Sequence, residues 1–267
     1  MATTVDPRAA VSPGAVLGDG VTIGPFTIVE AGAVIGDGTT VAANAYIAGA
    51  ARIGSECRIH HGAVIGNAPQ DLKYAGEPTL CVLGDRNTVR EFATLHRGTG
   101  EGGKTVIGND NFLMAYTHVA HDCVLGDRII MANAASLAGH TDVEDYVIIG
   151  GLTPVHQFTR LGRHSMIGGG LRVGKDVPPY VLAGNDPLTF EGLNSIGLRR
   201  RGFTRETLEA LDRAYALIYH SKLNVSQAVA AIEADASLAA VAEVGILVAF
   251  IRSSKRGIIP GPRALHR

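Results

Sequence analysis

The fold is decided by a run of six-residue units that starts at Ile107 and reads IGNDNF-LMAYTH-VAHDCV-LGDRII-MANAAS-LAGHTD through residue 142. Each unit opens with an aliphatic residue or Met, and this spacing continues without a miss to Val173. An earlier run with the same period extends from Val11 to Ile65. A period of six fits neither an α-helix nor an alternating strand. It is typical of a parallel β-helix whose coil takes three hexapeptides, roughly eighteen residues.

The repeats predict an all-β domain over residues 1–186, and the chain after them predicts an α-helical domain over residues 187–267. The period fails near residues 70–82 and 100–105, so both segments are expected to project from the β-helix as loops. Hexapeptide β-helices are left-handed as a class, and that hand is expected here from the likeness to the class. Beyond residue 187 apolar residues recur at helical spacing, and Asn224 with Gln227 resembles a capping box.

Composition limits the location and the partners of the chain. Hydrophobic residues make up 46% of the sequence, yet no apolar run approaches the roughly 18 residues that span a membrane. The first ten residues lack the apolar core of a secretory signal, so a cytoplasmic protein is expected. The formal net charge of −1 argues against nucleic acid as a partner. Cys57, Cys81 and Cys123 take positions that hold Ala in other units, which predicts packing and no disulfide.

Eight of the ten histidines lie within the repeats, and none takes an inward aliphatic position. Coils of eighteen residues place His121, His140 and His156 on one wall in successive turns, with His118 just before it. Histidines on an outer wall are expected to be either solvated or functional. A site is favoured here because so many are grouped on one wall.

Gly139 follows His121 by eighteen residues, so its N–H is expected about one strand spacing away. An imidazole, with an ordinary pKa of about 6.5, can remove a proton near neutral pH. Asp122 is placed to orient that imidazole, and a backbone N–H can stabilise a tetrahedral oxyanion. The pattern favours acyl transfer to a hydroxyl group by direct attack.

The histidine wall has two other interpretations. Outward histidines on a β-helix can bind zinc, as in the γ-class carbonic anhydrases. The tight spacing of His118 and His121 disfavours that chemistry, so no metal is predicted. The other is a non-catalytic β-helix scaffold, which would need neither grouped outward histidines nor a polar loop.

The chain resembles the UDP-N-acetylglucosamine O-acyltransferases of lipid A biosynthesis over nearly its whole length. The stretches that carry the resemblance are QDLKYAGEP at residues 70–78, HRGT at 96–99, HVAHDC at 118–123, LAGH at 137–140, VHQF at 155–158, DVPPY at 176–180 and RRGF at 200–203. The first and third are the most specific, because hexapeptides alone occur in many acyltransferases and in some non-enzymes.

The resemblance implies transfer of an (R)-3-hydroxyacyl chain from acyl carrier protein to the 3-hydroxyl of UDP-N-acetylglucosamine, the first step of lipid A biosynthesis. No cofactor is implied beyond the phosphopantetheine of the carrier protein. The family is a homotrimer with sites between subunits. By analogy His121 is the general base, Asp122 its partner and the N–H of Gly139 the oxyanion donor.

The resemblance also implies two groups of binding residues. The cleft around the base is expected to be lined by Asp71, Lys73, His118, His140, His156 and Gln157. The nucleotide and its phosphates are expected to contact Asn194, Arg200 and Arg201. Gly169 matches the position that limits the depth of the acyl chain, although a turn role in this glycine run is equally expected.

Other acyltransferases fit less well. The later N-acyltransferase of the pathway carries a uridine-binding domain before its β-helix, whereas the repeats here begin by Val11. Transferases that use acetyl- or succinyl-CoA lack the QDLKYAGEP stretch. Some family members have an acidic residue where this chain has Ile196, so a nucleotide contact is expected to differ. The length of the acyl chain, and a 3-amino sugar as the acceptor, stay open.

Overall fold

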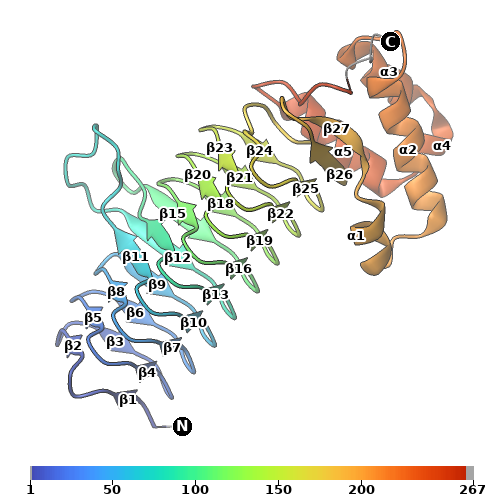
Figure 1. Cartoon of the computed structure of the whole chain (residues 1–267). Helices are drawn as coiled ribbons and strands as arrows, with labels where there is room; N and C mark the ends of the chain where they lie inside the picture. The colour runs from blue at the N-terminus through green and yellow to red at the C-terminus, as the bar shows by residue number, and fades with distance from the viewer. Residues whose placement is uncertain (1, 263–267) are drawn as a thin grey trace.

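The computed structural model describes residues 2–262, which form a long three-sided prism of short strands with helices at its C-terminal end (Figure 1). Each face of the prism is one sheet, and every third strand of the chain returns to the same face. All pairs are parallel except the last, β26 with β27. The architecture is therefore the predicted parallel β-helix.

The strands of the three faces are short. Sheet A contains β1 (Thr4–Val5), β4 (Thr22–Ile23), β7 (Thr40–Val41), β10 (Arg58–Ile59), β13 (Thr88–Val89), β16 (Phe112–Leu113), β19 (Ile130–Met131), β22 (Ile148–Ile149), β25 (Met166–Ile167), β26 (Val181–Gly184) and β27 (Thr189–Leu193). Sheet B contains β2 (Ala10–Val11), β5 (Ile28–Val29), β8 (Tyr46–Ile47), β11 (Val64–Asn67), β14 (Thr94–His96), β17 (His118–Val119), β20 (Ser136–Leu137) and β23 (Pro154–Val155). Sheet C contains β3 (Val16–Leu17), β6 (Val34–Ile35), β9 (Ala51–Ile53), β12 (Leu80–Leu83), β15 (Lys104–Ile107), β18 (Val124–Leu125), β21 (Asp142–Val143) and β24 (Arg160–Leu161).

The register of the sheets explains the period of the sequence. Val119 pairs with Leu137 and Leu137 with Val155, which puts residues eighteen apart directly above one another. These side chains point into the prism and are at most 3% exposed. Burial of an aliphatic side chain stabilises a fold by about 1.5–3 kcal/mol, so the column of aliphatic residues holds each coil on the next.

Both interruptions of the period leave the prism at the same corner. Residues 68–79 connect β11 to β12 and residues 97–103 connect β14 to β15, each passing from sheet B to sheet C. The inward residues keep their pairing across the gap, because Ile53 pairs with Leu83 and Leu83 with Ile107. The insertions therefore project outward without disturbing the core (Figure 1). We call the series of turns from sheet B to sheet C the loop corner.

The C-terminal domain contains α1 (Ser195–Arg200), α2 (Arg205–Tyr219), α3 (Val225–Ala234), α4 (Ala236–Ala239) and α5 (Ala242–Ser253). Asn224 and Gln227 form the predicted capping box at the start of α3. Strand β27 lies inside the range predicted as helical and continues sheet A. Its sequence, TFEGL, has aromatic and β-branched residues and a glycine at a φ of 119°, which suits a strand end better than a helix. No helix within residues 2–262 is long and apolar enough to cross a membrane.

The last coil holds the helical domain through a buried aspartate. Asp176 is 1% exposed, and its carboxylate accepts hydrogen bonds from Ser254 Oγ at 2.6 Å and Arg160 N at 2.9 Å. The guanidinium of Arg160 lies 4.4 Å from the ring of Phe250 in α5. These contacts fix the helices against the end of the prism.

Candidate active site

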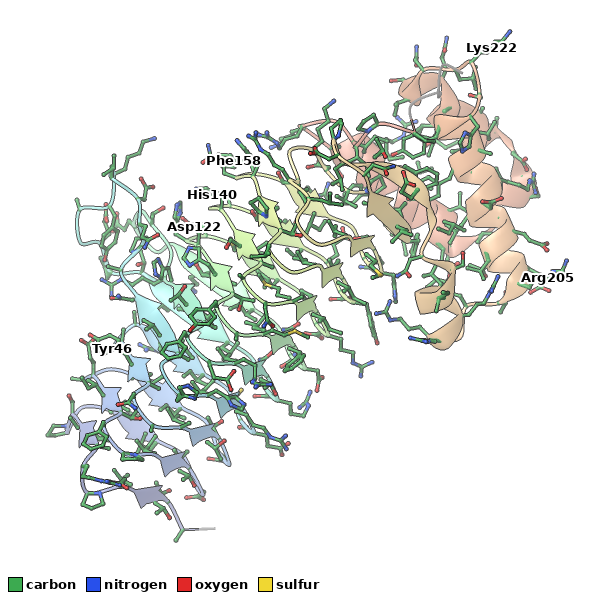
Figure 2. All side chains as sticks on the ribbon, in the orientation of Figure 1. Tyr46, Asp122, His140, Phe158, Arg205 and Lys222 are labelled. Carbon is green, nitrogen blue, oxygen red and sulfur yellow. The ribbon has the colours of Figure 1, made fainter. Side chains whose placement is uncertain are left out.

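The predicted base and its neighbours lie at the loop corner. His118 belongs to β17, and the turn after that strand carries His121 and Asp122 before β18 begins. The next coils place His140 and then Phe158 at the same turn position, so these residues follow one another along one edge of the prism (Figure 2). Asp122, His140 and Phe158 all have a φ near 60°. Each coil thus offers one side chain to the same corner.

Asp122 is held on both sides by hydrogen bonds. Its Oδ2 lies 2.9 Å from His121 Nδ1, and the carboxylate also accepts from Thr99 Oγ1 at 2.6 Å and Thr99 N at 3.1 Å. Burial raises the pKa of Asp122, but the hydrogen bonds from Thr99 and His121 outweigh it and lower the pKa below its usual value. The aspartate is therefore held as a carboxylate, and in the tautomer with its proton on Nδ1 the imidazole donates to it and leaves Nε2 as an acceptor.

Gly139 approaches the imidazole as closely as the sequence predicted. A Cβ on Gly139 would lie 2.4 Å from Cε1 and 2.5 Å from Nε2 of His121, so any side chain at this position would push the imidazole aside. The N–H of Gly139 donates no hydrogen bond to any group in the described range. A free backbone donor next to an imidazole is the arrangement that stabilises an oxyanion.

His140 lies between the base and an aromatic ring. Its ring centroid is 5.2 Å from that of His121, edge to face, and 4.6 Å from that of Phe158, stacked. Its Nε2 is 3.8 Å from Asp122 Oδ2. The ligand atoms of His121, Asp122 and His140 lie within 4.8 Å of one another, a spacing that a metal ion can bridge. Asp122 Oδ2 already pairs with His121 Nδ1 at 2.9 Å, so this oxygen is engaged within the cluster itself.

The first loop brings Asp71 to the base. Asp71 Oδ2 lies 4.0 Å from His121 Nε2, on the side of the ring opposite Asp122. Asp71 Oδ1 accepts from the backbone N of Lys73 at 3.0 Å, and Lys73 is exposed. The loop thus adds a carboxylate and an exposed cation to the edge of the site.

A groove of about 400 Å³ starts at His121 and crosses sheet B. His118 and Gln157 line it together with backbone and small side chains of β20 and β23. His118 Nδ1 is 2.7 Å from Thr94 Oγ1, and burial, with the neighbouring His121, lowers its pKa. His156 lies at the rim, where its Nδ1 is 3.0 Å from the carbonyl oxygen of Gln157. All the residues predicted around the base therefore lie at one corner or its groove.

The three residues predicted for the nucleotide lie at another corner. Asn194 is 7% exposed and caps α1, and its Nδ2 donates to the carbonyl oxygen of His164 at 3.0 Å. Arg201 lies over the ring of Tyr146 at 5.0 Å, and Arg200 is exposed. Tyr146 and His164 belong to turns from sheet C to sheet A, so one chain does not bring this group to His121. We call the stacked residues Arg128, Tyr146, His164 and Tyr180 the aromatic corner.

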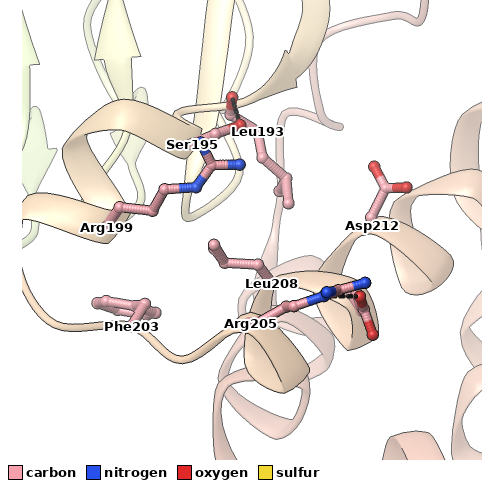
Figure 3. A pocket seen from close by; sticks show the side chains of 8 residues that line it. Leu193, Ser195, Arg199, Phe203, Arg205, Leu208 and Asp212 are labelled. Atoms are coloured by element: carbon pink, nitrogen blue, oxygen red, sulfur yellow. Dashed lines mark hydrogen bonds and ion pairs between the residues drawn. The ribbon is translucent and has the colours of Figure 1, made fainter.

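Arg199, which precedes Arg200 and Arg201 in the chain, lines a pocket away from the aromatic corner. It lines a pocket of about 540 Å³ between α1 and α2 together with Phe203 and Leu208 (Figure 3). Arg205 at the same pocket is paired with Glu209 at 2.7 Å. The arginine run of residues 199–201 is therefore split between this pocket and the aromatic corner.

Gly169 lies in a turn from sheet A to sheet B, beyond the far edge of the groove. A Cβ there would be 3.0 Å from the carbonyl oxygen of Gly151, so a side chain would fit only if the neighbouring turn moved. The structure therefore accounts for this glycine by close packing of two turns.

Thr99 and Arg97 are site residues to which the sequence assigned no role. Thr99 holds Asp122, and the guanidinium of Arg97 donates to Tyr74 Oη at 2.7 and 3.1 Å. Both lie in the HRGT stretch, directly before the second break in the period. That break was the available signal, because residues at the start of a projecting loop lie beside the preceding and the following coil.

Comparisons with known proteins agree over nearly the whole chain. Residues 176–259 match the family model described as Udp N-acetylglucosamine O-acyltransferase, domain 2, and residues 32–67 match the bacterial transferase hexapeptide model. The acyl-[acyl-carrier-protein]--UDP-N-acetylglucosamine O-acyltransferase of Thiobacillus denitrificans is 51% identical over 257 residues, covering 96% of this chain and 99% of its own. That of Verminephrobacter eiseniae is 48% identical, with the same coverage.

Solved structures give the same result. The UDP-N-acetylglucosamine acyltransferase of Bacteroides fragilis superposes with a TM-score of 0.93 at 45% identity, covering 95% of this chain and 99% of its own. The Francisella novicida enzyme has a TM-score of 0.94 at 36% identity, covering 99% and 100%. These relatives and the hexapeptide repeats fit the left-handed coil expected for the prism.

Proposed function

The chain belongs to the UDP-N-acetylglucosamine O-acyltransferases, and from that membership we propose that it transfers an (R)-3-hydroxyacyl chain from acyl carrier protein to the 3-hydroxyl of UDP-N-acetylglucosamine. In that role it is an acyltransferase of lipid A biosynthesis. The arrangement of His121, Asp122 and Gly139 supports a direct attack, with no covalent intermediate on the protein.

The proposed proton path uses one imidazole twice. His121 Nε2 removes the proton from the sugar hydroxyl while its oxygen forms a bond to the thioester carbon. The carbon–sulfur bond then breaks, and the proton returns from His121 to the departing thiolate of the phosphopantetheine arm. Asp122, 2.9 Å from Nδ1, orients the ring and stabilises its protonated form.

The observation that carries the proposal is the free N–H of Gly139 beside His121. A hydroxyl that reaches Nε2 must attack a carbonyl carbon in the same small space. The oxygen of that carbonyl becomes negative as the tetrahedral intermediate forms, and an unpaired N–H there lowers its energy. A general base alone would suit many reactions, whereas base and amide together favour acyl transfer.

The nucleotide is proposed to bind between two copies of the chain in a homotrimer. Arg200 and Arg201 suit a diphosphate because guanidinium groups bind phosphate oxygens in pairs. Arg201 lies over Tyr146 at the corner between sheets C and A and Arg200 precedes it at the end of α1, whereas His121 lies at the corner between sheets B and C. A single substrate can therefore meet both groups only if they come from different subunits. We accordingly place Asp71, Lys73, His118, His140, His156 and Gln157 around the sugar on one chain and Asn194, Arg200 and Arg201 on its neighbour.

The acyl chain is proposed to follow the groove over sheet B toward the turn of Gly169. The groove begins at His121, and its lining includes the small apolar residues Ala120, Ala138 and Pro154. The donor is carried on the phosphopantetheine of acyl carrier protein, so the reaction needs no further cofactor and no metal. Lys73 and neighbouring cations would meet the acidic carrier protein.

The test is transfer from (R)-3-hydroxyacyl carrier proteins of several chain lengths to UDP-N-acetylglucosamine, with mass spectrometry of the product. A 3-O-acylated nucleotide is the expected result, and the chain-length profile tests the groove. If only a 3-amino analogue is acylated, the proposed acceptor sugar is wrong, whereas the proposed roles of His121, Asp122 and Gly139 are retained. If neither sugar is acylated, the proposed function is wrong.

A further inference from the structure

The loop of residues 68–79 is tied to the prism through one side chain. Tyr74 receives two hydrogen bonds from Arg97, Nη2 at 2.7 Å and Nε at 3.1 Å, and donates one to the carbonyl oxygen of Glu77 at 3.0 Å. The guanidinium carbon of Arg97 is 5.4 Å from the centroid of the same ring. Charge-assisted bonds to a half-buried hydroxyl are stronger than those between neutral groups.

Tyr74 is coupled within the loop to the residues that reach the base. Its backbone N donates to the carbonyl oxygen of Asp71 at 3.1 Å, and Asp71 Oδ1 accepts from the N of Lys73 at 3.0 Å. These bonds make residues 71–74 one tight turn. When Tyr74 is held, the carboxylate of Asp71, 4.0 Å from His121 Nε2, is held as well.

Arg97 itself is fixed on the prism side. Its backbone N donates to the carbonyl oxygen of Asn67 at 3.1 Å, at the end of β11. The carboxylate of Glu30 is nearby: hydrogen bonds from Tyr46 and the N–H of Gly49 lower its pKa against the effect of burial, and the charge of Arg97 lowers it further. The backbone of Arg97 is therefore tied to sheet B, from which its guanidinium reaches the loop.

Two residues later, Thr99 holds Asp122 through its hydroxyl and its N–H. Residues 97–99 thus fix both carboxylates that flank His121, one through the loop and one directly. We propose that Arg97 is a positioning residue, which docks the loop of residues 68–79 through Tyr74 and so sets Asp71 and Lys73 at the base. The effect on catalysis rests on the proposed function, whereas the docking of the loop does not.

The first readout is the rate of trypsin cleavage after Lys73, followed by mass spectrometry under native conditions. Arg97→Met and Tyr74→Phe should each speed this cleavage several-fold, because each frees the loop. Arg97→Lys, which keeps the charge but loses the paired donors, should fall between them and the wild type. Arg205→Met removes an exposed cation outside the site and is the matched control.

The second readout is steady-state acyl transfer by the same variants in the full-length protein. Displacing a positioning group by about 1 Å costs up to about 100-fold in rate, so Arg97→Met and Tyr74→Phe should lower kcat/KM by about 10- to 100-fold. Combining the two substitutions should add little, because both break one link. A role in stability alone would lower the melting temperature and leave kcat/KM of the folded fraction unchanged.

The outcomes separate the two proposals. The role of Arg97 would be overturned if Arg97→Met and Tyr74→Phe were cleaved after Lys73 at the same rate as Arg205→Met and had the same kcat/KM. It would also be overturned if the losses of kcat/KM in the two single variants were fully additive in the double variant. Faster cleavage in a protein whose wild type acylates no UDP-sugar would support the docked loop and reject the proposed function. Should Arg97→Met fold poorly, Tyr74→Phe and Arg97→Lys carry the same comparison with smaller changes.

Discussion

The loop corner and the aromatic corner place histidines at equivalent turn positions of one prism, yet in opposite environments. His140 at the first and His164 at the second have φ values of 60° and 59°, and each stacks on an aromatic ring at 4.6 Å. His140 neighbours the carboxylate of Asp122, whereas burial and then the charges of Arg201 and Arg163 lower the pKa of His164 to about 4. The repeat therefore supplies a row of side chains at each corner, and at the loop corner a carboxylate and the inserted loops lie beside the histidines.

The strongest test of this difference removes the base. His121→Ala should lower the rate of acyl transfer by about 10²–10⁴, because a positioned general base contributes about that factor. Circular dichroism should show an unchanged fold, since His121 lies in a turn outside the core. His220→Ala, at the C-cap of α2 and away from both corners, should keep full activity. Equal activity of both variants would refute the assignment of the base.

The next test moves the base without removing it. Gly139→Ala should lower kcat by about 10²-fold, because the new Cβ would lie 2.4 Å from His121 Cε1 and push the ring away from the reacting atoms. Gly245→Ala in α5 is the matched control, since a Cβ there meets no atom within 4 Å. The control should keep its activity and gain about 0.5–1 kcal/mol of stability. Retention of full activity by Gly139→Ala would contradict the close packing of glycine and imidazole.

A smaller effect is expected when the support of Asp122 is weakened. Thr99→Val removes a hydrogen bond that lowers the pKa of Asp122, so that pKa should rise. The carboxylate must be ionised to hold His121, hence the acidic limb of the pH profile of kcat/KM should move to higher pH. Thr99→Ser keeps the hydroxyl and should leave the limb in place. A profile of Thr99→Val that matches the wild type would exclude this role.

At the aromatic corner we expect an effect of pH on stability. The folded-state pKa of His164, about 4, lies below the value of about 6.5 of an unfolded chain, so the unfolded state takes up the proton first as pH falls. Stability from this group is therefore present above about pH 6.5 and is lost towards pH 4. His164→Phe should reduce the loss of urea midpoint between pH 7.5 and pH 5, and Phe158 already occupies the same turn conformation. An unchanged loss would mean that the pKa of His164 is the same in the folded and the unfolded protein and would contradict the lowered value.

The prism was predictable because its information is local and repeated. Every inward aliphatic residue marks the same position in its six-residue unit, so the coils and the loops could be predicted from the spacing. The proximity of His121 and Gly139 could be predicted because they are eighteen residues, or one coil, apart. The contacts of Thr99 and Arg97 were not predictable, because they span 23 residues and depend on how an inserted loop folds back. Strand β27 was missed since its pairing with β26 depends on a turn rather than on the period.

Asn194 shows a second limit of what the sequence can predict. The nucleotide contact that the resemblance implies stays a prediction, and the structure shows a second role: the side chain caps α1, bonded to Gly197 N and the carbonyl oxygen of His164. No pattern in the sequence separates a capping asparagine from a binding one, since both are Asn before a helix.

The three thiols buried inside the prism can report which part of the protein unfolds first. Cys57, Cys81 and Cys123 are free and fully buried, the first two within one turn of each other and the third two turns beyond Cys81, and burial raises the pKa of Cys81 and of Cys123 to about 12. An alkylating reagent reacts with thiolate, so each cysteine stays silent until its own coil opens. Because coils are held mainly by their neighbours, the order in which the three are labelled would show from which end the stack unravels.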